Sequence, residues 1–170
     1  MINSLSLKDI LDENNIKYST FVHPALYTVD DSKKMRGKID GAHTKNLFLK
    51  NKKNEFFLFS CLESSRIELK LLKKNLNLGN ISFAKEEYLN NLLGVKPGSV
   101  TPFGLLNDLE KKIKFFFDSK LEKYQSFNFH PLINTETINI KKNDFYNLFK
   151  IYNITINLIN FETYGSDGIR

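Results

Sequence analysis

The segment from Gly41 to Lys50 constrains the fold of this chain more than any other. A corner of small residues leads to the pair Lys45–Asn46 and then to the apolar run 47–49, which is typical of the buried part of a strand. The polar stretch 51–54 and the apolar stretch 55–61 follow. Two apolar runs joined by a short polar turn predict a β-hairpin.

Lys45 stands where the predicted strand becomes buried. Removing an ammonium group from water is costly unless it has a partner, and an anionic ligand would be a suitable one. The alternative is a lysine that extends from the end of a strand into solvent, which is common. This segment alone does not decide between the two.

Two further segments carry residue types that suit a binding site. The stretch 94–104 holds three glycines and two prolines in eleven positions, and such residues permit close approach of a ligand and stiffen the backbone. The stretch 129–137 carries a histidine, an asparagine and two threonines beside a strand-like run. Each segment alone is more often a plain turn, with His130 anchoring the bend at Pro131.

Together the three segments resemble the YbaK-like, or prolyl-tRNA-synthetase-associated, editing domains. The sequences His23-Pro-Ala and Thr28-Val fit the N-terminal pattern of the same family. The similarity is greatest to the free-standing branch that clears mischarged alanyl-tRNA(Pro), and it extends over residues 5–158. We therefore expect a single editing domain over residues 1–160 and a C-terminal tail over residues 161–170.

The resemblance implies three catalytic residues. Lys45 matches the Thr-Lys-Asn motif of the family, Gly98 opens its Gly-x-x-x-Pro loop, and His130 matches its site histidine. Lys45 can position a phosphate or ester, stabilise charge on the carbonyl oxygen, or act as a base if burial lowers its pKa, and the sequence leaves these roles open. The expected substrate-binding residues are Thr44, Asn46, Ser99, Thr101, Pro102 and Asn134.

The activity implied by the resemblance is hydrolysis of mischarged Ala-tRNA(Pro) without a metal or other cofactor. The alternatives are a deacylase of Cys-tRNA(Pro) or of another small-amino-acid tRNA, and a non-catalytic module that binds tRNA or a synthetase. The expected partner is the acceptor end of tRNA(Pro), with prolyl-tRNA synthetase or an elongation factor as further candidates. The three histidines are far apart and lack the short spacing of a zinc motif, which agrees with a metal-free site.

Composition adds limits but no function. The chain has 170 residues, enough for one domain with a core, and a net charge of +6 that permits a polyanionic partner without establishing one. A lone cysteine, Cys61, excludes an internal disulfide framework and fits a small core residue in a strand. No run is long and apolar enough to span a membrane and no secretory signal is visible, so we expect a cytoplasmic protein.

Periodicity and turn residues predict an α/β fold, in which a mixed sheet is flanked by helices. The first expected helix opens at Ser4 as its capping residue, the second is capped by Thr28, and Gly94 ends the fourth. The expected helices span residues 4–14, 28–35, 68–75, 85–93 and 143–152. The expected strands span residues 17–22, 47–50, 55–61, 81–83, 112–117, 126–129, 137–140 and 154–159.

Overall fold

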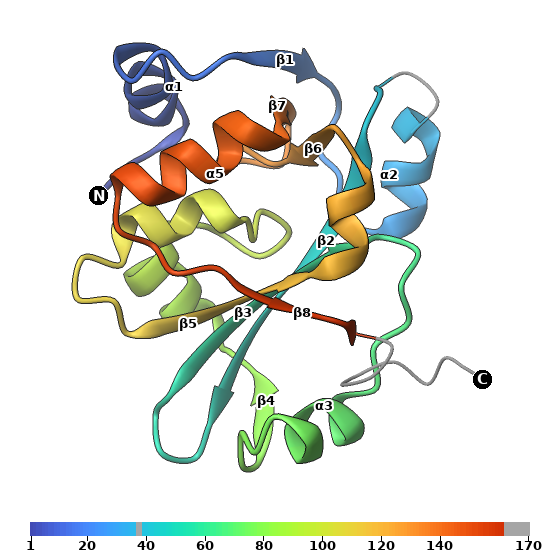
Figure 1. The fold of residues 1–170 in the computed structure, drawn as a ribbon, viewed down its shortest axis with the longest axis vertical. Coiled ribbons are helices and arrows are strands. Elements are labelled where there is room, and N and C mark those ends of the chain that lie inside the picture. The colour runs from blue at the N-terminus through green and yellow to red at the C-terminus, as the bar shows by residue number, and fades with distance from the viewer. Residues whose placement is uncertain (37–38, 162–170) are drawn as a thin grey trace.

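The computed structural model describes residues 1–36 and 39–161 of the chain (Figure 1). Within these ranges eight strands form one sheet in the order β1-β7-β6-β2-β3-β5-β8, with β4 paired to β2 beside this path. Because parallel pairs such as β2–β6 and β3–β5 occur beside antiparallel ones such as β2–β3, the predicted mixed sheet is confirmed. The strands are β1 (Tyr18–Val22), β2 (Ala42–Asn51), β3 (Phe56–Leu62), β4 (Ile81–Phe83), β5 (Ile113–Asp118), β6 (Ser126–Phe129), β7 (Glu136–Lys141) and β8 (Asn157–Ile159).

Helices pack on both faces of this sheet, as the α/β prediction requires (Figure 1). Helix α5 crosses one face near β6 and β7, whereas α3 lies at the other end of the molecule beside β4. Among the described residues no helix is long and apolar enough to cross a membrane. The helices are α1 (Ser4–Glu13), α2 (Val29–Arg36), α3 (Leu69–Asn75), α4 (Glu86–Tyr88) and α5 (Lys142–Ile151), with a π-helical turn η1 (Leu89–Leu93) and the 3₁₀ helices η2 (Pro102–Asn107) and η3 (Ser119–Lys123).

Two apolar cores hold the central hairpin from both sides. Phe48 and Leu58 enter the larger core, which α1, α5, η1 and η2 also line. Leu49 and Phe59 enter the smaller core, to which α3 contributes Leu72. Neighbouring residues reach different cores because successive side chains of a strand point to opposite faces. The strand that carries the Thr-Lys-Asn motif is therefore fixed at the centre of the sheet.

The predicted hairpin is confirmed, but its first strand is longer than the sequence indicates. β2 begins at Ala42 and runs antiparallel to β3 from Thr44 to Lys50. Lys45 consequently lies inside a strand and not at its mouth. The small residues before Lys45 belong to the strand because Ala42 and His43 pair with the parallel strand β6, a long-range contact that local patterns do not reveal.

Three local expectations need correction. The cap of α1 is Asn3, whose side chain accepts hydrogen bonds from the amides of Leu5 and Ser6, and not Ser4. Helices η2 and η3 were not predicted, because short 3₁₀ turns have no distinctive period. Phe161, expected in the tail, is buried with its ring centroid 5.8 Å from that of Phe59. The rest of the expected tail, residues 162–170, lies outside the described residues.

Candidate active site

A cavity of about 200 Å³ lies at the open edge of β2 and gathers the three predicted catalytic residues. Lys45 reaches it from β2, Gly98 from the loop before η2, and His130 from the end of β6. Thr44 and Asn46, two of the predicted substrate-binding residues, line the same cavity. The remaining lining residues are Leu26, Tyr27, Thr28, Ser32, Glu63 and Val100.

The cavity exists because β2 is only partly covered on one side. β2 pairs with β6 at Ala42 and His43 and with β4 from Leu49 onward, so the intervening residues have β3 as a neighbour on one side alone. The amide of Glu63 donates to the carbonyl oxygen of His43 over 2.8 Å, which sets the bonded pairs of this ladder. Because bonded and non-bonded pairs alternate along antiparallel strands, the N–H and C=O of Asn46 point away from β3, toward the open edge.

Lys45 is half-buried, and its ammonium group donates a hydrogen bond to the backbone carbonyl of Ser65. That contact comes from the loop that follows β3, so it holds the side chain across the hairpin. The next residue along β2, Asn46, is also held in place, because its side-chain oxygen accepts a hydrogen bond from the Ser60 hydroxyl over 2.5 Å. The cavity thus presents a positioned cation beside a backbone N–H, two groups that can stabilise negative charge on a carbonyl oxygen.

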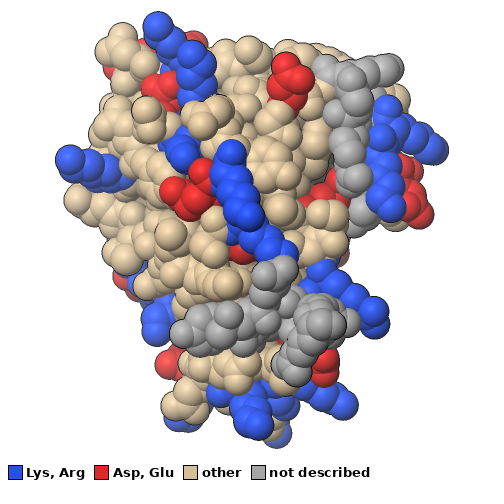
Figure 2. All heavy atoms as spheres, turned by 45° about the vertical axis from the view of Figure 1, so that its right-hand side comes forward, with Lys and Arg blue, Asp and Glu red and all other residues tan. Residues whose placement is uncertain are grey.

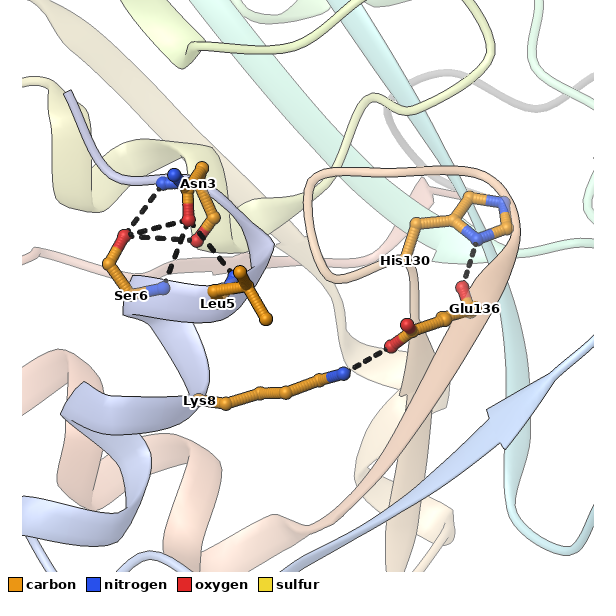
Figure 3. A network of polar contacts seen from close by, with 6 residues as sticks. All are labelled: Asn3, Leu5, Ser6, Lys8, His130 and Glu136. Atoms are coloured by element: carbon orange, nitrogen blue, oxygen red, sulfur yellow. Dashed lines mark hydrogen bonds and ion pairs between the residues drawn. The ribbon is translucent and has the colours of Figure 1, made fainter.

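His130 contributes a neutral ring. Its Nδ1 lies 2.9 Å from the carbonyl oxygen of Glu136, and since a carbonyl can only accept, Nδ1 carries the hydrogen (Figure 3). Burial lowers the pKa of His130, against the opposing effect of that hydrogen bond, and the nearby His23 lowers it further. Nε2 is then an acceptor with no hydrogen-bond partner among the described residues, available to a water or a substrate hydroxyl.

The loop that carries His130 is also tied to the first helix. The carboxylate of Glu136 pairs with the Lys8 ammonium at 2.5 Å, while its backbone oxygen holds His130 (Figure 3). Both Lys8 and Glu136 are partly shielded from water. The N-terminal helix α1 therefore helps to fix the start of β7, whose backbone holds the ring of His130.

Gly98 approaches the cavity by its backbone. Its φ of +86° lies in the left-handed region, which favours glycine, and a Cβ there would stand 3.1 Å from Cδ1 of Tyr27. Nδ2 of Asn134 would stand 3.4 Å from the same Cβ, and this side-chain amide donates to the carbonyl of Leu26, in the segment before α2, over 3.2 Å. These contacts hold the glycine, the tyrosine ring and the asparagine together at one side of the cavity mouth.

Four of the predicted substrate-binding residues do not line the cavity. Thr101 is fully buried and caps η2, accepting a hydrogen bond from the amide of Phe103 over 3.4 Å, and Pro102 is the first residue of that helix. Ser99 and Asn134 line an adjoining hollow of about 550 Å³. In the structure these residues shape the Gly98 loop, and direct contact of any of them with substrate stays a prediction.

Several residues that line the cavity were not predicted from the sequence. Glu63 is 5% exposed and lines the cavity one residue after β3, and Tyr27 is 70% exposed at its mouth. A charged residue directly after a buried apolar strand is a signal that could have singled out Glu63. No comparable signal existed for Tyr27, because its position depends on the contact with Gly98.

The other two histidines are engaged in hydrogen bonds within the protein, and the cysteine is buried. His23 bonds with Thr137 and with the carbonyl of Pro24, each over 2.8 Å, and His43 bonds with the carbonyl of Ile39 over 3.0 Å. Burial raises the pKa of the Cys61 thiol to about 12, so the thiol is not a nucleophile at neutral pH. In the described part of the chain no group of three potential metal-ligating side chains is close enough to hold an ion.

With this geometry established, comparison with known proteins gives the family. The profile of the aminoacyl-tRNA editing domain matches residues 23–148, which include Lys45, Gly98 and His130. The chain belongs to the aminoacyl-tRNA editing domain family. The resemblance found in the sequence motifs is thereby confirmed.

Relatives of this editing domain share most of its length. It is 30% identical over 141 residues to the prolyl-tRNA editing protein ProX of Acetoanaerobium sticklandii, covering 82% of this chain and 86% of the relative. It is 34% identical over 145 residues to prolyl-tRNA synthetase associated domain-containing protein 1 of Xenopus laevis, with 82% and 86% covered. A solved structure described as a candidate trans-editing enzyme for prolyl tRNA synthetase has the same fold, with a TM-score of 0.69, 17% identity and 99% of both chains covered.

Proposed function

We propose that this editing domain is a trans-acting aminoacyl-tRNA deacylase that hydrolyses the ester of mischarged Ala-tRNA(Pro). The observation that carries the proposal is the single cavity that brings Lys45, the backbone of Asn46, the loop at Gly98 and the neutral His130 together. The names of the relatives, a prolyl-tRNA editing protein and prolyl-tRNA synthetase associated proteins, support tRNA(Pro) as the carrier.

Each group has a role in ester hydrolysis. Water attacks the carbonyl carbon, the bond to the ribose oxygen breaks, and the departing oxygen takes up the proton that the attacking water loses. Lys45 and the N–H of Asn46 stabilise the charge that develops on the carbonyl oxygen. Nε2 of His130 accepts a hydrogen bond that orients the water or the neighbouring ribose hydroxyl, and that hydroxyl assists the attack. The backbone at Gly98 lets the terminal adenosine approach closely.

The small cavity suits a small amino acid. A synthetase cannot firmly reject an amino acid whose side chain is smaller than that of its cognate amino acid. A second, narrower site is therefore needed to remove the error. In this domain Gly98 and Val100 line the cavity, and the loop that carries them leads directly into the buried helix η2, which stiffens it. A packed wall excludes the larger proline ring by steric clash, and this exclusion discriminates more sharply than favourable contacts with the alanine methyl group would. The cavity therefore favours alanine over proline.

The partner surface is less specific than the cavity. On the face drawn in Figure 2, lysine and arginine side chains are spread over many places, with acidic groups among them, and do not gather into one patch. We expect modest, salt-sensitive affinity for tRNA, with recognition concentrated at the acceptor end. Prolyl-tRNA synthetase or an elongation factor would then deliver the charged tRNA, in the cytoplasm where translation uses it.

The experiment that tests this function follows release of alanine from Ala-tRNA(Pro) with the purified protein in excess. The proposal requires release well above spontaneous hydrolysis. Faster release from Cys-tRNA(Pro) would assign the sister specificity. Tight binding of Ala-tRNA(Pro) with no release of the amino acid would leave the non-catalytic tRNA-binding module.

A further inference from the structure

Glu63 gives the candidate active site a second charge, of opposite sign to that of Lys45. It is 5% exposed and is the single acidic residue in the cavity lining as the described residues define it. It also takes part in a further interaction within the protein. Neither the family motifs nor the ester-hydrolysis scheme assigns this residue a task.

The strand register places the two charges close together. Lys45 is paired with Cys61 across the hairpin, and the bond from the Glu63 amide to the His43 carbonyl extends the same register by two residues. Lys45 and Glu63 therefore stand on one face as diagonal neighbours, a relation in which Cβ atoms are about 7 Å apart and long side chains reach each other's surroundings. The cavity is thus polarised, positive at Lys45 and negative at Glu63.

The aminoacyl ester has the complementary polarity. Its α-ammonium group is positive, and its carbonyl oxygen becomes negative as water attacks. The two atoms belong to one short group, and a hydrogen bond of about 2.8 Å at each end lets that group span the gap between two side chains placed in this way. His130 is kept neutral by burial and so does not compete for the carboxylate as a cation.

We propose that the Glu63 carboxylate binds the α-ammonium group of the aminoacyl ester while Lys45 faces its carbonyl oxygen. This inference rests on the deacylase function proposed above and adds a specificity-determining residue to it. Through Glu63 the site selects esters with a free α-amino group, in addition to selecting by side-chain size. Esters whose α-nitrogen is acylated, or replaced by a neutral group, are then poor substrates.

The test compares Ala-tRNA(Pro) with lactyl-tRNA(Pro), in which a hydroxyl group replaces the α-ammonium and the rest of the acyl group is unchanged. Glu63→Gln keeps the size of the side chain and removes its charge. A hydrogen bond to a charged group is worth enough that its loss changes a rate about 10–100-fold. We expect the wild type to prefer the alanyl ester by that factor. Glu63→Gln loses most of this preference by slowing on the alanyl ester alone.

The exposed Glu68, which makes no capping bond at the start of α3, supplies the matched control. Glu68→Gln should leave both rates unchanged, and thermal melting shows whether Glu63→Gln is folded. Equal slowing on both esters by folded Glu63→Gln, or no slowing on either, overturns the ammonium contact while the deacylase function stands. A wild type that hydrolyses neither ester overturns the deacylase function, and this inference falls with it.

Discussion

The backbone of Gly98 is in contact with the ring of Tyr27: a Cβ added to Gly98 would stand 3.1 Å from the ring carbon Cδ1 and 3.6 Å from Cε1. The tyrosine precedes α2 and the glycine precedes η2, so this contact joins two segments about seventy residues apart at the mouth of the cavity. The exposed ring has room to move, but the position of Gly98 also demands a left-handed backbone.

Gly98→Ala should therefore slow deacylation markedly while lowering the free energy of unfolding only slightly. The methyl group displaces the Tyr27 ring and strains the loop, with a strain of about 1 kcal/mol or more. Gly79→Ala is the matched control, because Gly79 has a φ of +73° but an added Cβ would meet, apart from its chain neighbours, only Nδ2 of Asn51 at 3.9 Å, an ordinary contact distance. Single-turnover rates and urea melts of both variants check this. Equal activity of the two variants would show that the Tyr27 contact has no part in the reaction.

Lys45→Ala should reduce the rate of ester hydrolysis about 10²–10³-fold, the usual effect of removing one group that stabilises an oxyanion. The fold should survive, because the half-buried side chain makes one hydrogen bond to the Ser65 carbonyl. Lys50→Ala on the same strand is the control, since Lys50 lies 5.3 Å from the centre of the Tyr88 ring and outside the cavity lining. Near-normal turnover by folded Lys45→Ala would remove Lys45 from the mechanism.

Because the pKa of His130 is lowered, we expect the free energy of unfolding to fall in acid. Burial lowers its pKa in the folded protein, whereas the unfolded chain binds the proton at the ordinary value of about 6.5. The unfolded state therefore takes up the proton first as the pH falls. The contribution of His130 to stability is full above pH 6.5 and is lost as the pH falls toward its lowered pKa. Urea unfolding of wild type and His130→Gln at several pH values measures it. The variant should lose less stability on acidification, and an identical pH dependence would contradict a buried neutral histidine.

Much of the fold could be predicted from the sequence, because its signals are local. The hairpin at 47–61 follows from two apolar runs around a polar turn. Gly94, with φ +69°, ends a helical segment as predicted, but that segment is the short α4 followed by the π-helical η1, and no sequence signal indicated the π turn. The strand order could not be predicted. The contact of Thr44 with the carbonyl of Asn128, 84 residues away, depends on global packing that no local pattern encodes.

The candidate site was predicted in part for the same reason. Lys45, Gly98 and His130 stand in ordered motifs, and the structure brings them into one cavity. Thr101 lies in such a motif as well, yet its hydroxyl caps η2, because a threonine before a proline suits a helix start as well as a ligand. Glu63 was missed although it directly follows a buried apolar strand, because charges at strand ends are often solvated and the signal is weak; its register with His43 places it beside the cavity.

Cys61 and metal ions should be dispensable. The thiol is buried in the smaller core with a pKa near 12, so Cys61→Ala should keep deacylase activity and lose about 1 kcal/mol of stability from the space it leaves. Activity should also persist in excess chelator. Inactivity of a folded Cys61→Ala protein would restore a thiol mechanism, and activity lost to chelator and regained with zinc would require a metal.

The central claim is tested most directly by one panel of deacylation rates on tRNA(Pro) charged with alanine, cysteine, serine or proline. A small cavity lined on one side by the loop residues Gly98 and Val100 predicts rapid clearance of the alanyl ester, slow cleavage of the slightly larger seryl ester, and sparing of the prolyl ester. Preference for the cysteinyl ester would contradict the assigned substrate. Failure to release any of the four amino acids, under conditions where a known deacylase works, would contradict the enzymatic function itself.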